Sequence, residues 1–152
     1  TFHASVQDLT GWQIWRFVTP AFLHFSVLHL VFNLMWWWYL GGMVERHLGS
    51  SKLLLLLLVG AAIPNLAEFL ASGPDFGGLS AVVNVLVGYV WLLGKRHPEQ
   101  ELQLPDGFFV FMVAWIAIGF TGLLGGHMAN VAHLVGLGIG LLHGWLDRRH
   151  LA

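Results

Sequence analysis

The fold is decided by one stretch, Gly77-Gly78-Leu79-Ser80-Ala81-Val82-Val83-Asn84-Val85-Leu86-Val87-Gly88-Tyr89-Val90-Trp91-Leu92-Leu93-Gly94. It carries no charge, and its paired glycines favour a turn that leads into an apolar helix. A helix over residues 80–93 rises only about 20 Å, less than the roughly 30 Å of bilayer hydrocarbon. We therefore expect Ser80 below the membrane surface, in a pocket that water reaches.

The composition predicts a membrane protein. Hydrophobic residues make up 57% of the 152 residues and charged residues 10%, and the mean hydropathy is +0.71. Charge-free intervals predict five spans, each apolar enough to cross a bilayer, near residues 20–41, 51–71, 80–93, 107–124 and 129–146. Pro20 is expected to begin the first span. The expected fold is an all-α polytopic membrane helix bundle.

The distribution of Lys and Arg predicts the orientation of the spans. If successive spans alternate in direction, one side of the bilayer receives all the basic residues except Arg16, namely Arg46, Lys52, Lys95, Arg96, Arg148 and Arg149. That side is expected to be the cytoplasm. The carboxyl terminus then faces the cytoplasm and Ser80 faces outward. Residues 1–19 are expected to form an outward segment that lies partly in the interface.

Several kinds of function are disfavoured by the composition. The chain has no cysteine, which excludes a thiol nucleophile, and its net charge of -1 gives no reason to expect nucleic acid. A metalloprotease or metal transporter using His24, His29 and His133 remains open as an alternative. It lacks a His-Glu-x-x-His run, so we expect neither a metal nor another cofactor.

A histidine in the last span is the predicted partner of Ser80. His133 lies beside a row of small residues at fourfold spacing, a pattern that lets membrane helices approach closely; the row is Ala132, Gly136, Gly140 and Gly144. Contact with Ala81 and Gly88 of the third span would bring the imidazole within reach of the Ser80 hydroxyl. Two alternatives stay open: Ser80 caps its own helix, and His133 bonds across helices for packing alone.

The first span carries a second polar group. His29 and Asn33 are four residues apart and share one helical face, with His24 about a turn and a half earlier. Acyl transfer needs hydrogen-bond donors aimed at the developing oxyanion, and these two side chains could act beside the Ser80 N–H. Interhelical packing is the alternative.

These motifs together resemble rhomboid intramembrane serine proteases of the bacterial GlpG type. The resemblance rests on Trp15-Arg16, residues 24–33, Gly78-Leu79-Ser80 and Ala132-His133-Leu134-Val135-Gly136, and it covers nearly the whole chain. It implies that residues 1–152 are a rhomboid membrane domain from a six-helix bundle, without the first helix. It also implies a bacterial inner membrane, transmembrane protein substrates, and an active site that opens to the periplasm.

The resemblance also implies roles for individual residues. Ser80 would be the nucleophile, His133 the general base, and His29 and Asn33 oxyanion contacts. Supporting positions are His24, Gly78, Asn84 and Asn130, and the loop around residues 126–130 would be a mobile cap.

Two residues depart from the family pattern. Ala81 stands where Gly is common, and Asn84 stands where Tyr is common; the Asn84 amide could bond the His133 ring in place of the aromatic contact. A non-catalytic rhomboid-like protein that binds transmembrane helices is therefore the competing function.

The acidic residue that follows His133 is Asp147, about 21 Å along the helix, so another group must orient the imidazole. Glu68, near the outer end of the second span, receives no role: it could line the wet entry or lie at the rim.

Overall fold

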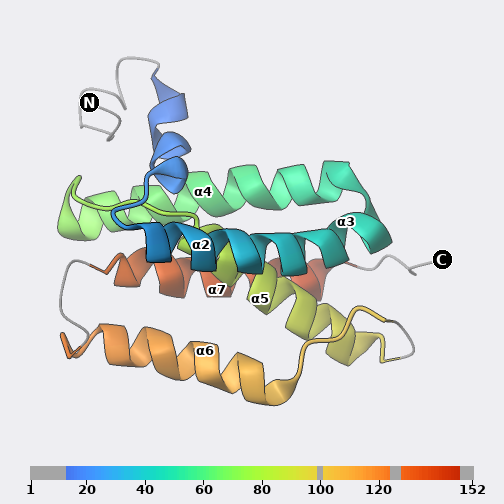
Figure 1. Cartoon of the computed structure of the whole chain (residues 1–152). Coiled ribbons are helices and arrows are strands. Elements are labelled where there is room, and N and C mark those ends of the chain that lie inside the picture. Colours follow the sequence, from blue (N-terminus) through green and yellow to red (C-terminus); the bar gives the residue numbers. More distant parts are fainter. Residues whose placement is uncertain (1–12, 99–100, 124–127, 148–152) are drawn as a thin grey trace.

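The regular structure in the described part of the chain is entirely helical, which confirms the all-α prediction. The computed structural model describes residues 13–98, 101–123 and 128–147. Its elements are the short helices η1 (Ile14–Phe17) and η2 (Thr19–Phe22), then α2 (Val27–Trp36), the π-helical η3 (Trp37–Gly41), α3 (Gly42–Leu48), α4 (Ser50–Ser72), α5 (Ser80–Arg96), α6 (Asp106–Gly119) and α7 (Asn130–Leu146). Figure 1 shows α4, α2–α3 and α7 running roughly alongside one another, with α6 at the lower edge.

The first long helix begins later than predicted and extends further. Pro20 does not start it, because Pro20 lies in the 3-10 turn η2. The helix begins at Val27, where the Ser26 hydroxyl caps it by accepting from the His29 N–H at 3.1 Å. It then continues through η3 and α3 until Gly49, whose φ of 86° ends it.

Two further boundaries differ from the sequence prediction. α6 ends at Gly119 rather than near residue 124. The first span was predicted to end near residue 41, whereas Glu45 lies beyond that point inside α3, and its carboxylate accepts from the Ser50 hydroxyl at 2.6 Å. The helices α4, α5 and α7 lie within a few residues of their predicted ranges.

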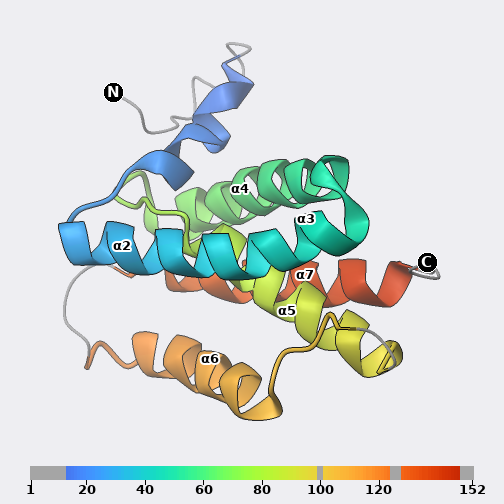
Figure 2. The ribbon, with the colours of Figure 1, turned by 45° about the vertical axis from the view of Figure 1, so that its right-hand side comes forward.

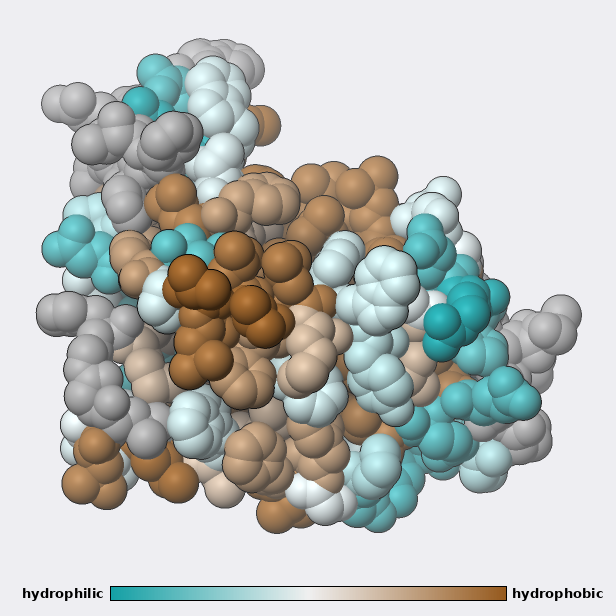
Figure 3. Space-filling view, in the orientation of Figure 1, coloured by the Kyte–Doolittle hydropathy of each residue, from teal (hydrophilic) through white to brown (hydrophobic). Residues whose placement is uncertain are grey.

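The molecular surface fits a bilayer. Two helices in the described ranges, Val27–Leu48 and Ser50–Ser72, are long and apolar enough to cross a membrane, and α6 and α7 are shorter apolar helices. Figure 3 shows apolar surface across the middle of one face and hydrophilic residues gathered at its right-hand end. In Figure 1 that end holds both the α3–α4 junction and the end of α5, which carry Arg46, Lys52, Lys95 and Arg96.

α5 is the central helix of the bundle. Twelve of its 17 residues are buried, and Figure 2 shows it passing between α2–α3 and α7. Its main partner is α7, whose Gly136, Gly140 and Gly144 face the α5 backbone. A Cβ added at Gly136 would lie 2.5 Å from the Ala81 carbonyl oxygen, and one added at Gly88 would lie 2.6 Å from that of Leu137. The predicted small-residue contact is confirmed, and it brings two backbones together.

Candidate active site

The structure brings Ser80 and His133 into direct contact. Ser80 is the first residue of α5 and His133 lies in the first turn of α7. Ser80 Oγ is 2.7 Å from His133 Nε2, a normal hydrogen-bond length. Leu79 is the N-cap of α5 and no side chain caps it, so the capping alternative for Ser80 is wrong. The contact predicted from the sequence is present, in a part-buried position.

The close approach of α5 and α7 sets this distance. Gly136 lies one turn after His133, and the carbonyl that it faces belongs to Ala81, which directly follows Ser80. The two reactive side chains therefore sit beside a backbone contact that has no room for a methyl group. His133 is only 7% exposed.

His29 packs against the loop that leads to Ser80. Gly78 has a φ of 120°, and a Cβ built there would lie 2.8 Å from His29 Nε2. A side chain at this position would therefore be strained by the backbone and would also collide with the ring. His24 meets the same region: its ring lies edge-on to that of His29 with centroids 5.0 Å apart, and its Nε2 accepts a long bond, 3.4 Å, from the Leu79 N–H.

Asn33 offers a donor that no described group uses. Its side chain is 6% exposed, and its Nδ2 is buried without a hydrogen-bond partner among the described residues. The same Nδ2 lies 3.7 Å from the point where a Gly78 Cβ would stand. A buried donor without a partner costs about 1–3 kcal/mol, so this amide is suited to an acceptor that binds beside Gly78.

Asn84 does not take the position that we considered for it. Its Nδ2 donates to the Ser80 carbonyl at 2.9 Å, one turn back on the same helix, and not to the His133 ring. Both Asn84 Oδ1 and His133 Nδ1 are buried without a partner within the described ranges. The amide therefore supports the Ser80 backbone, and the imidazole is oriented by other means.

Asn130 connects two helices rather than reaching the dyad. Its Nδ2 donates at 2.8 Å to the carbonyl of Gly119, which joins the start of α7 to the end of α6. Residues 126 and 127 of the predicted cap lie outside the described residues, so the cap stays a prediction.

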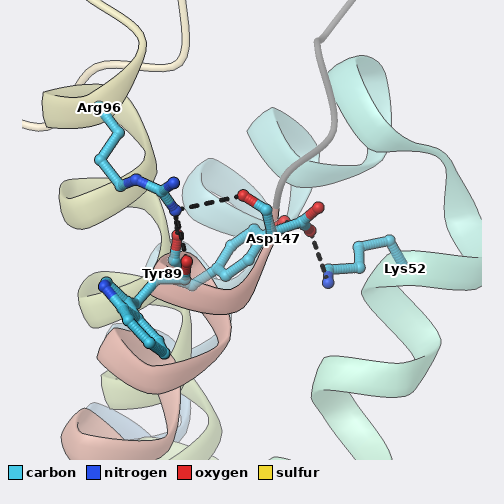
Figure 4. A network of polar contacts seen from close by, with 6 residues as sticks. Lys52, Tyr89, Arg96 and Asp147 are labelled. Atoms are coloured by element: carbon cyan, nitrogen blue, oxygen red, sulfur yellow. Dashed lines mark hydrogen bonds and ion pairs between the residues drawn. The ribbon is translucent and has the colours of Figure 1, made fainter.

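The far end of α7 is held by a polar network that the sequence did not predict (Figure 4). Arg96 donates to three carbonyls where α7 ends, those of Gly144, Trp145 and Asp147. The Asp147 carboxylate forms a 2.8 Å ion pair with Lys52 of α4 and accepts from the Tyr89 hydroxyl of α5 at 2.7 Å. α7 is thereby fixed to both neighbouring helices at the end opposite His133. The signal in the sequence was Asp147 directly after a long apolar run.

A hydroxyl in contact with an imidazole, with donors beside it, is suited to nucleophilic attack on a carbonyl. No group of three or more His, Cys, Asp or Glu placed to hold a metal occurs in the described part of the chain. This geometry resembles that of a serine hydrolase site, and it lies inside an apolar helical bundle.

Comparison with known proteins places the chain in a family. The family model for the Rhomboid domain matches residues 11–150, and the chain belongs to the rhomboid family. It is 54% identical over 140 residues to proteins named Rhomboid protease GlpG from Yersinia pestis (strain Pestoides F) and Serratia proteamaculans (strain 568). A protein of the same name from Yersinia enterocolitica is 53% identical. These matches cover 92% of this chain and 50% of each relative, so the chain spans about half the length of the curated relatives it matches.

Proposed function

We propose that this protein is an intramembrane serine endopeptidase that works through a Ser80–His133 dyad. The observation that carries the proposal is the 2.7 Å contact between Ser80 Oγ and His133 Nε2 at the junction of α5 and α7. Membership of the rhomboid family, together with similarity to proteins that are named as rhomboid proteases, supports the same conclusion.

The reaction would proceed by acyl transfer. His133 Nε2 takes the Ser80 proton as Oγ attacks the peptide carbonyl. The tetrahedral intermediate then breaks its C–N bond, and His133 gives that proton to the leaving amine. Water hydrolyses the resulting acyl-enzyme by the reverse sequence, which regenerates the free hydroxyl. Nδ1 must carry the ring hydrogen while Nε2 accepts the Ser80 proton.

The oxyanion would form beside Gly78. Asn33 Nδ2, the His29 ring and the Ser80 backbone N–H are the donors assigned to it. The unpartnered Asn33 donor is the strongest support for this assignment. His24 and Gly78 hold the His29 ring and the loop in place.

The substrates would be transmembrane helices of other membrane proteins. A carbonyl within an intact helix is bonded to an N–H, so the substrate must unwind locally before attack. We assign the protein to a bacterial inner membrane, with the basic ends of α3 and α5 in the cytoplasm and Ser80 open to the periplasmic side.

The test is cleavage of a single-span substrate by the purified protein in proteoliposomes. Ser80→Ala is expected to abolish cleavage and to keep substrate binding, while Ser72→Ala, at the exposed end of α4, serves as the control with native activity. An unchanged product yield with Ser80→Ala would refute the assignment of Ser80 as the nucleophile. Binding without cleavage by the native protein would favour a non-catalytic rhomboid-like protein.

A further inference from the structure

A carboxylate from another helix reaches the first turn of α7. Glu68 of α4 is 3% exposed, and its Oε2 accepts from the backbone N–H of Ala132 at 2.9 Å. Ala132 directly precedes His133. Figures 1 and 2 show the carboxyl end of α4 lying near the amino end of α7.

This bond replaces a cap that α7 lacks. The N-cap position is Ala129, which has no side-chain acceptor. The first N–H groups of a helix have no intrahelical partner, and a negative charge is favourable at this end. Glu68 thus supplies from α4 the acceptor that Ser, Thr, Asn or Asp usually supplies from the helix itself. Within the described ranges no cationic side chain forms an ion pair with Glu68.

The dyad needs such a support. His133 Nδ1 has no hydrogen-bond partner within the described ranges, so no bond at this nitrogen fixes the ring. The ring orientation must therefore come from the backbone of α7 and from packing. Glycine contacts fix the middle of the helix and the Arg96 network fixes its far end. The turn that carries His133 has two contacts with other helices, from Asn130 to the Gly119 carbonyl and from the Ala132 N–H to Glu68.

We propose that Glu68 is a positioning residue of the dyad, and that its carboxylate anchors the first turn of α7 and so holds the imidazole against Ser80. The inference rests on the proposed function for its catalytic consequence, whereas the anchoring itself is independent of chemistry. Displacement of a reacting group by about 1 Å lowers rates by on the order of 100-fold.

The test compares Glu68→Met with Glu68→Gln. Methionine is unbranched like glutamate but offers only a thioether sulfur, a weak acceptor, whereas the glutamine side chain retains a carbonyl oxygen. For cleavage of the single-span substrate, we expect Glu68→Met to lower kcat at least tenfold and to keep KM within twofold of the native value. We expect Glu68→Gln to keep kcat within threefold of the native value. Amide hydrogen exchange over residues 129–135 should accelerate in Glu68→Met and not in Glu68→Gln.

Asn65→Leu is the matched control. Asn65 lies one turn earlier on α4, is also buried, and donates to the Phe17 carbonyl at 2.7 Å, away from α7. We expect no change in exchange at the start of α7. Native kcat or native exchange in Glu68→Met, or equal losses in Glu68→Met and Glu68→Gln, would overturn the proposal. Failure of the native protein to cleave would instead contradict the proposed function, and the exchange data would still test the anchor.

Discussion

Gly136→Ala should separate the two catalytic side chains without altering either one. A Cβ at residue 136 would lie 2.5 Å from the Ala81 oxygen, whereas ordinary van der Waals contact begins at 3.4 Å. α5 and α7 must therefore part locally by about 0.9 Å, the difference between these values. A separation of that size along the line between Ser80 and His133 lengthens their 2.7 Å contact to about 3.6 Å, too long for a hydrogen bond.

The expected result is a large loss of activity with a moderate loss of stability. General-base catalysis is worth on the order of 100- to 10,000-fold, so we expect Gly136→Ala to slow reaction of Ser80 with a fluorophosphonate by about 100-fold. Overpacking costs about 1–3 kcal/mol of unfolding free energy. The assay is the labelling rate in detergent micelles, with thermal unfolding measured on the same samples.

Gly138→Ala is the control within the same helix. Nothing lies within 4 Å of a Cβ at that position, so the substitution adds helix propensity, worth up to about 1 kcal/mol, and no collision. Native labelling rates in both Gly136→Ala and Gly138→Ala would refute the argument that backbone contact sets the dyad distance.

Two further predictions concern the loop and the cytoplasmic network. Gly78→Ala should lower the rate of substrate cleavage at least tenfold, because the added Cβ would collide with His29. Gly73→Ala should keep native activity, because Gly73 shares the positive φ but has no atom within 4 Å of an added Cβ. Equal activities of the two variants would contradict this prediction. Lys52→Met should destabilise the protein by about 3 kcal/mol, measured by unfolding in denaturant, because it removes the Lys52 partner of the buried Asp147 carboxylate. An unfolding free energy within 0.5 kcal/mol of native, on the order expected for surface changes, would show that this ion pair contributes little.

The sequence predicted the contact between Ser80 and His133 better than the interactions that support it. Ser80 and His133 could be paired because a short span and a small-residue row limited which helices approach closely. The helix start at Val27 was missed because a charge-free interval shows where a span can lie. It does not show where a capping residue such as Ser26 begins the helix. The end at Leu48 was missed because charges after an apolar run suggest a turn, although charged residues continue a helix readily.

Glu68 and Asn84 show what a sequence pattern does not contain. Periodicity places Glu68 near the outer end of its helix, but its partner is a backbone N–H that follows a separate loop, and backbone donors leave no mark in the sequence. Asn84 shares a helical face with Ser80, which allows a bond either to the His133 ring or to the carbonyl one turn back. The structure selects the carbonyl, and this choice depends on side-chain geometry that spacing does not determine.

The most direct test is to label the native protein with a fluorophosphonate and to map the modified peptide. The account predicts one adduct, on Ser80, that is lost in His133→Ala and retained in His47→Ala, which changes a half-buried histidine on α3. An adduct on another serine, or full labelling of Ser80 without His133, would contradict it.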